Sequence, residues 1–150
     1  MFPFVDNINS YIKADEASGK HGIVAGGAGD GVEVTGTTID RLGYGSASIV
    51  IVAVATLQAS ETLKLTVTEQ QSADNSTWDS ATSFIAETTY LTGESGGSTD
   101  VAVSQTAVNF AGKKRYVRYN ITPQLSAGGT DTAAFGATAI KGGAQTKPAS

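Results

Sequence analysis

The chain has 150 residues, a formal net charge of −4 at pH 7 and a charged fraction of 16%. This length fits one domain with its own core, and the acidic balance argues against a protein that holds nucleic acid through phosphate contacts. The sequence contains no cysteine, which excludes a disulfide framework, a thiolate nucleophile and a cysteine-based zinc site.

Residues 1–31 differ in character from the rest of the chain. Their first part carries apolar residues with rough helical spacing, and residues 19–31 are rich in glycine. The apolar residues are Phe2, Phe4, Val5, Ile8, Tyr11 and Ile12. We expect an N-terminal arm, as a short helix or extended, on a glycine-rich hinge. The arm either docks on a neighbouring subunit or folds back as an edge element.

The start of the chain has no basic segment followed by a continuous apolar run, so no secretory signal is expected. The longest apolar run, residues 49–55, is far shorter than the roughly 20 residues that a membrane helix needs. We therefore expect synthesis in the cytoplasm and no membrane partner.

The body reads as seven short strands separated by turn residues, with no strong helical pattern. The expected strands are 32–40, 47–57, 62–70, 82–89, 101–110, 115–122 and 133–140. This pattern predicts an all-β fold, an antiparallel β-sandwich of the jelly-roll kind. The expected division is an arm and hinge over 1–31, a sandwich body over 32–143 and a flexible tail over 144–150.

Three details of the body are predicted from local pattern. Residues 47–57 are apolar on both parities, which is typical of a central strand covered on both faces, in the core or at a subunit interface. Residues 58–61 form a tight connection to the alternating run 62–70, as in a β-hairpin. Pro123 is expected to end the preceding strand, because proline cannot donate to a ladder.

No local motif for catalysis, a cofactor or a metal is found. The glycines of residues 26–31 lack the spacing and the strand–helix context of a phosphate-binding loop. His21 is the only histidine and lies between glycine-rich stretches, so it is a poor base for a triad. Asp74, Asn75 and Asp79 could supply calcium ligands, although turn formation explains them better. We expect a non-enzymatic protein. The alternative is a glycoside hydrolase, because two catalytic carboxylates on separate strands leave no local sequence motif.

One basic cluster stands out, formed by Lys113, Lys114, Arg115 and Arg118. It could meet an acidic partner surface or packaged DNA, but a solvated turn and strand edge is the ordinary explanation. The large aromatic residues are expected to anchor the core rather than to stack on carbohydrate. They are Trp78, Phe84, Tyr90, Phe110 and Phe135.

Two segments resemble recurrent patterns in small virion proteins of tailed bacteriophages. The first is ETLKLTVTEQQSADNSTWDSA, residues 61–81, in which a strand meets a polar turn closed by tryptophan. The second is KKRYVRYNITPQLSAGGTDTAAFGATAIKGGAQ, residues 113–145, in which an Arg-Tyr strand precedes a proline turn and an alanine-rich strand. The closest resemblance is to capsid decoration, or cement, proteins.

The resemblance implies a bacteriophage structural protein of the virion that binds and stabilises the assembled head. Its partner would be the major capsid protein, and it would form a homo-oligomer, with a trimer favoured. Phe2, Phe4 and Tyr11 of the arm, with Arg115 and Arg118, are the expected contact residues. No cofactor, metal or direct nucleic-acid contact is expected. The alternatives are a tail-tube or head–tail connector protein and a carbohydrate-binding β-sandwich that uses Trp78.

Overall fold

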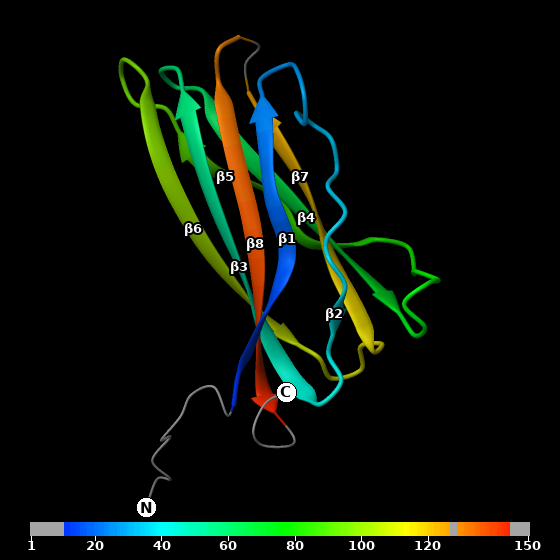
Figure 1. Ribbon diagram of the computed structural model, residues 1–150. Coiled ribbons are helices and arrows are strands. Elements are labelled where there is room, and N and C mark those ends of the chain that lie inside the picture. The colour runs from blue at the N-terminus through cyan, green and yellow to red at the C-terminus, as the bar shows by residue number, and fades with distance from the viewer. Residues whose placement is uncertain (1–10, 127–128, 145–150) are drawn as a thin grey trace, which may run out of the picture.

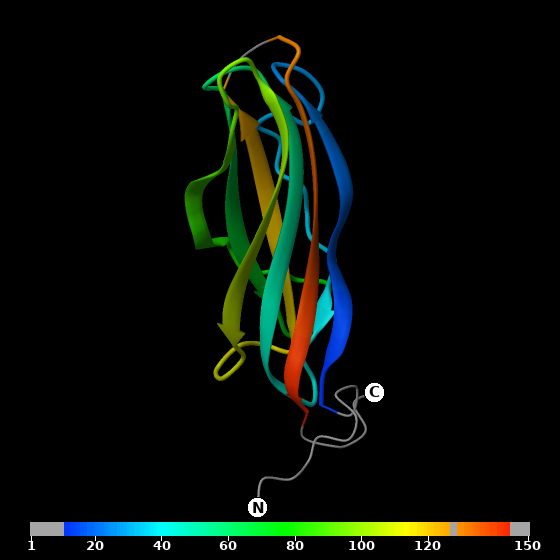
Figure 2. The same cartoon turned by 90° about the vertical axis from the view of Figure 1, so that its left-hand side faces the viewer.

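The computed structural model describes residues 11–126 and 129–144, and within them it contains strands and no helix. Eight strands form two stacked four-stranded antiparallel sheets (Figures 1 and 2). The strands are β1 (Lys13–Val24), β2 (Ile39–Asp40), β3 (Tyr44–Leu57), β4 (Thr62–Ser72), β5 (Thr82–Thr92), β6 (Ser98–Asn109), β7 (Tyr116–Leu125) and β8 (Thr132–Ala144). The predicted all-β sandwich is confirmed, with eight strands instead of about seven. No described segment is a helix long and apolar enough to cross a membrane.

The strand order is that of a jelly roll. One sheet runs β1-β8-β3-β6 and the other β2-β7-β4-β5, so early and late strands interleave in both. Only β4 and β5 are consecutive strands of one sheet, and every other connection crosses between the sheets.

The hairpin expected around residues 58–61 is therefore wrong. β3 pairs with β6 on one side and β8 on the other, and β4 lies in the opposite sheet. The connection is an arch, in which Ser60 adopts a left-handed backbone with a φ of 66° and donates its N–H to the carbonyl of Gly93. In the sequence, a hairpin within one sheet and an arch between two sheets have the same pattern, a short polar break between two apolar runs.

The core lies between the sheets and follows the alternation of the strands. β3 contributes Ile49 and Ile51, and β4 contributes Leu63, Leu65 and Val67, all at most 1% exposed. β7 adds Val117, Tyr119 and Ile121, which occupy every second position of the strand. The outer sides of the sheets are thus left to meet solvent or a partner.

Residues 13–24, expected to belong to the arm and hinge, form the edge strand β1 of the sandwich. β1 runs antiparallel to β8, from Lys13 opposite Lys141 to Val24 opposite Thr132. For this stretch the fold-back alternative is the one observed, while Phe2 and Phe4 lie outside the described residues. The glycine-rich loop that follows is closed by Asp30, whose carboxylate accepts the N–H groups of Gly26 and Leu125.

β7 passes through Pro123 and ends at Leu125, so the expectation that Pro123 ends the strand is wrong. The Pro123 carbonyl accepts the N–H of Gly31, on the side away from β4. In a strand the N–H and C=O of one residue point to the same side. The N–H that Pro123 lacks would therefore point away from β4, so its absence does not interrupt the ladder between β7 and β4.

The strand expected over residues 32–40 is reduced to a single bridge at Val34 and the two residues of β2. The chain between them passes close to β7, where the Gly36 N–H donates to the side-chain oxygen of the buried Asn120 at 3.1 Å. This segment covers β7 without extending the sheet.

Candidate interaction surface

The outer side of the β2-β7-β4-β5 sheet is polar, and its charges are paired. Lys64 on β4 bonds Glu87 on β5 at 3.0 Å, and both side chains are well exposed. Arg118 on β7 donates to the side-chain oxygen of Gln70 on β4 at 3.0 Å. Such a surface is well solvated and needs no cover.

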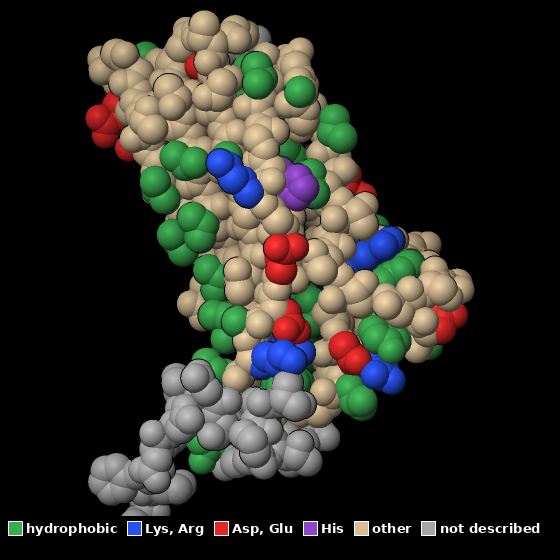
Figure 3. All heavy atoms as spheres, in the orientation of Figure 1, with side chains coloured by type: hydrophobic (Ala, Val, Ile, Leu, Met, Phe, Trp, Pro, Cys, Tyr) green, Lys and Arg blue, Asp and Glu red, His purple; other side chains and the backbone are tan. Residues whose placement is uncertain are grey.

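The outer side of the β1-β8-β3-β6 sheet is different. Its middle carries five valines, Val50, Val52 and Val54 of β3 with Val101 and Val103 of β6, which we call the valine face. Val52 lies opposite Val103, and Val54 opposite Val101, so the side chains form one patch. Val101 and Val103 are 65% and 67% exposed. Figure 3 shows apolar side chains gathered on this side over β3 and β6.

The surroundings of the valine face are uncharged. The outward positions of β8 next to it are small, with Ala134 opposite Val54 and Gly136 opposite Val52. By strand alternation, β8, β3 and β6 present no charged side chain to this side, and the charges there come from Glu16 and Lys20 of β1. The expectation that β3 is covered on both faces is thus wrong for the single chain, because its outer face is open.

Those predicted contact residues that the structure describes, Tyr11, Arg115 and Arg118, lie elsewhere. Arg115 bonds both carboxylate oxygens of Asp40 and stacks on Tyr116, with 4.9 Å from guanidinium carbon to ring centroid. That bond holds the pKa of Asp40 below its usual range. Arg118 stacks on Trp78, and Tyr11 is half-buried at the start of β1. The structure does not bring these residues together with the valine face.

The Trp78 loop is built around an internal turn. Asp74 accepts the N–H groups of Ser76 and Thr77 at 2.9 and 2.8 Å and the hydroxyl of Ser72 at 3.0 Å. These bonds, the two backbone ones first, hold the pKa of Asp74 well below its usual range. The turn interpretation is the one observed. Arg118 covers one face of Trp78, 4.1 Å from the ring centroid, so that face is not free to stack on a sugar.

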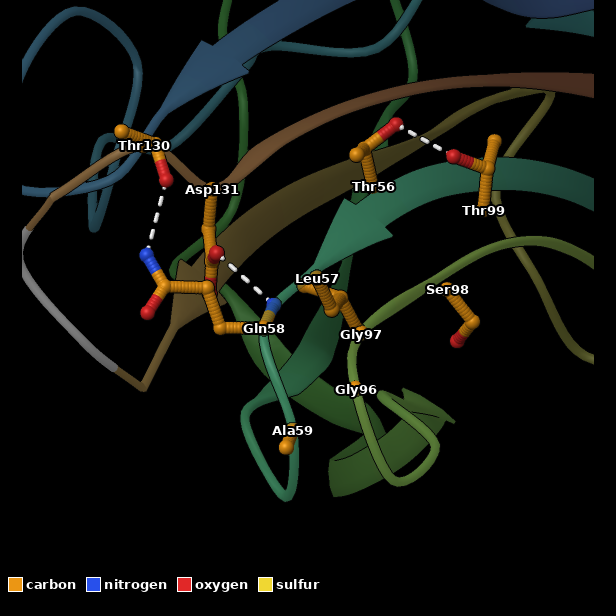
Figure 4. Close-up of a pocket in the computed structure, with 10 residues that line it drawn as sticks. All are labelled: Thr56, Leu57, Gln58, Ala59, Gly96, Gly97, Ser98, Thr99, Thr130 and Asp131. Atoms are coloured by element: carbon orange, nitrogen blue, oxygen red, sulfur yellow. Dashed lines mark hydrogen bonds between the residues drawn. The ribbon is translucent and has the colours of Figure 1, made fainter.

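A pocket of about 520 Å³ lies at one end of the sandwich (Figure 4). Its carboxylate, Asp131, is 2% exposed and accepts the backbone N–H of Gln58 at 2.9 Å. The Gln58 amide in turn donates to the hydroxyl of Thr130 at 2.7 Å. The acid thus holds the β3–β4 arch in place, and the lining offers no second carboxylate or histidine.

Two further kinds of site could support catalysis in the described part of the chain, a histidine base and a metal centre. His21 on β1 lies against the ring of Phe135, with 5.5 Å between the centroids. Residues 11–126 and 129–144 contain no group of three or more His, Asp or Glu side chains that could hold a metal ion. The feature that sets this molecule apart is therefore a surface.

No family model matches the sequence, and no curated protein is similar to it in sequence. The fold does have relatives among solved structures. The T13 viral particle of infectious bursal disease virus aligns with a TM-score of 0.54 and 16% identity, over 93% of this chain and 33% of that one. The VP2 subviral particle of the same virus aligns with a TM-score of 0.53 and 16% identity, over 91% of this chain and 33% of that one.

What these structures share with the chain is the jelly-roll fold. The chain spans about a third of the length of the proteins that it matches. The structural relatives are thus particle proteins of an icosahedral virus, which supports the jelly-roll part of the expectation and leaves the tailed-phage part untested.

The valine face was missed from the sequence, although one signal for it was present. The run from Ala47 to Leu57 is apolar on both parities, which predicts a strand in the core or at a subunit interface but does not say which side chains would form the exposed face. The outward valines of β6 carry the same signal in weaker form, since Val101 and Val103 alternate with Ala102 and Ser104.

Proposed function

We propose that this chain is a non-enzymatic structural protein of a virus particle, and that it binds its particle through the valine face. The observation that carries the proposal is the exposure of Val52, Val54, Val101 and Val103 as one uncharged patch. Contiguous apolar patches of this kind mark sites of protein interaction. The jelly-roll fold, shared with particle proteins, supports the same role.

The energy available from the patch fits binding to an ordered array. Each half-exposed valine gains about 1 kcal/mol on burial, so a single face binds weakly by itself. A shell offers many equivalent sites, and linked subunits convert weak contacts into strong overall attachment. A patch of this size is therefore suited to a protein that acts on a lattice.

The particular role that we propose is decoration, or cement, on an assembled head, with the major capsid protein as the partner. A subunit that binds the assembled lattice and not its free components stabilises the lattice by mass action. Phe2, Phe4 and Tyr11, with Arg115 and Arg118, are secondary candidates for contacts with neighbouring subunits. A tail-tube or connector role is the competing placement within the same class.

The first test is location. Particles are purified on a density gradient from the culture that carries this sequence and labelled with gold-conjugated antibody against the protein. Label over the heads is the expected result. Label confined to tails would move the proposal to a tube or connector, and protein found only in particle-free fractions would contradict a structural role.

The second test addresses the valine face itself. Val52→Lys places a charge in the middle of the patch, where the side chain reaches water in the free protein but not in the complex. We expect at least a tenfold loss of co-sedimentation of added protein with particles that lack it, with an unchanged circular dichroism spectrum. The matched control is Thr66→Lys, on the outer side of β4 in the other sheet, which should bind as the parent does. Equal binding by Val52→Lys and the parent would contradict the assignment of this face.

A further inference from the structure

The two sheets have four edge strands, and three of them carry features that prevent pairing with another chain. β1 is charged and has register shifts on either side of Ser18. β5 has three register shifts against β4, and β2 has only two residues. Bulges, charges and short length are the usual protection of an edge. β6 is the exception, with 12 residues, no proline or lysine, and an unbroken register against β3.

The hydrogen-bonding groups of this edge can be assigned from the register. The Phe110 N–H donates to the Gly45 carbonyl at 3.0 Å, which makes this a hydrogen-bonded pair. Such pairs alternate along an antiparallel ladder, so the even-numbered residues of β6 bond to β3. The odd-numbered residues, Thr99 to Asn109, direct their N–H and C=O groups outward. No other strand of the described chain pairs with them.

The space beside this edge is open. A groove of about 340 Å³ lies between β5 and β6, lined by Ile85 and Tyr90 on one side and by Ala102, Ser104 and Thr106 on the other. The Ser104 and Tyr90 hydroxyls bond at 3.1 Å across it. A strand added along β6 would lie over this groove, and it would need small side chains on its inner face. β6 itself has them, namely Ala102, Ser104 and Thr106.

We propose that two copies of this chain associate through β6, edge to edge and antiparallel about a two-fold axis. The two β1-β8-β3-β6 sheets then form one continuous eight-stranded sheet, and the two valine faces lie side by side on its outer surface. The free N–H and C=O groups belong to the odd-numbered residues of β6, so hydrogen bonding requires odd residues of one copy to lie opposite odd residues of the other. The two such registers with the greatest overlap place the two-fold axis at Val103 or at Ser104. This inference does not depend on the proposed function.

A second copy fits this edge better than a different strand of the same chain. Asp100 is the single charge of β6, and in both registers it faces a neutral residue, Thr106 or Val108 of the other copy, so no like charges meet. A head-to-tail arrangement would instead set β6 against β1, with Lys13, Asp15, Glu16 and Lys20 and its irregular register. The pairing of β6 with β6 is isologous and closes as a dimer, and it avoids the charges and the irregular register of β1.

The first experiment measures solution mass by light scattering after size exclusion. The parent should elute at twice the chain mass of 15.3 kDa. Val103→Lys brings two ammonium groups together near the axis and should give the monomer. Val52→Lys is the matched control, because it changes the cross-strand neighbour of Val103, one strand in from the edge. It should keep the dimer while losing particle binding, so the two proposals fail separately.

The second experiment uses the absence of cysteine from the chain. With the axis at Val103, Val103→Cys places the two thiols opposite each other, so mild oxidation should give a covalent dimer. With the axis at Ser104, residue 103 faces residue 105 of the other copy, and the crosslink should need Val103→Cys together with Gln105→Cys. Val54→Cys, equally on the outer side but on β3, should remain uncrosslinked. A parent that is monomeric at all soluble concentrations would overturn the proposal, as would a trimer that survives Val103→Lys. Loss of the dimer on deletion of residues 1–10 would also overturn it, since that segment would then be the true occupant of the edge.

Discussion

Glu69 is a buried carboxylate at the centre of a polar cluster. It points inward from β4, is 4% exposed, and accepts two bonds from the Lys113 ammonium at 2.6 and 2.8 Å. The Tyr119 hydroxyl and the Gln71 amide donate to it at 2.9 and 2.8 Å. A buried carboxylate is tolerated when its lone pairs are satisfied in this way. The cluster joins β4, β7 and the β6–β7 loop.

This cluster predicts a loss of stability in alkali. Burial first, and then the charge of Glu69, raise the pKa of Tyr119 above its ordinary value of 10.0. A group with a raised pKa in the folded state contributes its stability fully below its unfolded pKa and loses it as the pH rises beyond that value. We expect the free energy of unfolding, measured by urea denaturation, to fall as the pH rises above about 10.

Tyr119→Phe is the control for this effect, because it removes the titrating hydroxyl and keeps the ring that packs on Phe84. The variant should be less stable at pH 7 and should lose less stability than the parent between pH 9 and pH 11, values of about one unit on either side of the ordinary tyrosine pKa. Parallel curves for the two proteins would contradict the role of Tyr119.

At this scale the sequence predicts local features and misses distant ones. The Asp74 turn is predictable because all its bonds lie within three residues along the chain. Glu69 has the parity of Leu65 and Val67 and so belongs to the buried face, but its partners are 44 and 50 residues away. Nothing local indicates that Lys113 and Tyr119 arrive to pair with it.

At the scale of elements, alternation locates the strands, but it does not identify their neighbours. The runs that became β4 and β7 are predicted nearly residue for residue, since each has one buried face. The arch at Ser60 and the passage of β7 through Pro123 depend on which strand lies alongside, and the sequence pattern contains no such information. The segment 32–40 is predicted to be one strand, but only Ile39 and Asp40 pair with β7 as a ladder, and Val34 makes an isolated bridge to Ile121.

This last segment offers a sharp test at Gly36. A β-carbon there would lie 2.1 Å from the carbonyl oxygen of Tyr119, so the backbone of the crossing segment would have to move. It would then lose the bond from Gly36 to Asn120. We expect Gly36→Ala to lower the free energy of unfolding by about 2–3 kcal/mol in a denaturant titration.

Gly45→Ala is the comparison. The nearest atom to its β-carbon would be 3.9 Å away, and its φ lies outside the left-handed region. It should change stability by less than about 0.5 kcal/mol. If both variants were equally stable, the close approach of this segment to β7 would be wrong.

For the whole molecule, the important property is the contrast between its two outer sides. One side pairs its charges, as in Lys64–Glu87 and Arg115–Asp40, and the other presents valines and small residues. The fold class follows from counting strands and turns. The proposed interaction surface does not, because a chain that is apolar on both parities gives the same pattern whether the second face meets its own chain or a partner.

This contrast predicts how attachment responds to salt. Burial of an uncharged face is little affected by screening, whereas contacts of Arg115 and Arg118 with an acidic partner would weaken strongly. We expect co-sedimentation with particles to change less than about twofold between roughly 0.05 M and 0.5 M sodium chloride. A steep loss of binding would favour the basic cluster as the contact surface.

The pairing of β1 with β8 also has a consequence in time. The strand nearest the start of the described chain finds its partner only among the last residues of the fold, and β3 shares that same partner. While the chain is being synthesised, at about 5–20 residues per second, this sheet is incomplete and its backbone groups are unpaired. The valine face is therefore not a finished surface on a nascent chain. The association proposed for this sheet therefore has to wait until β8 is in place, which would separate folding from assembly in time.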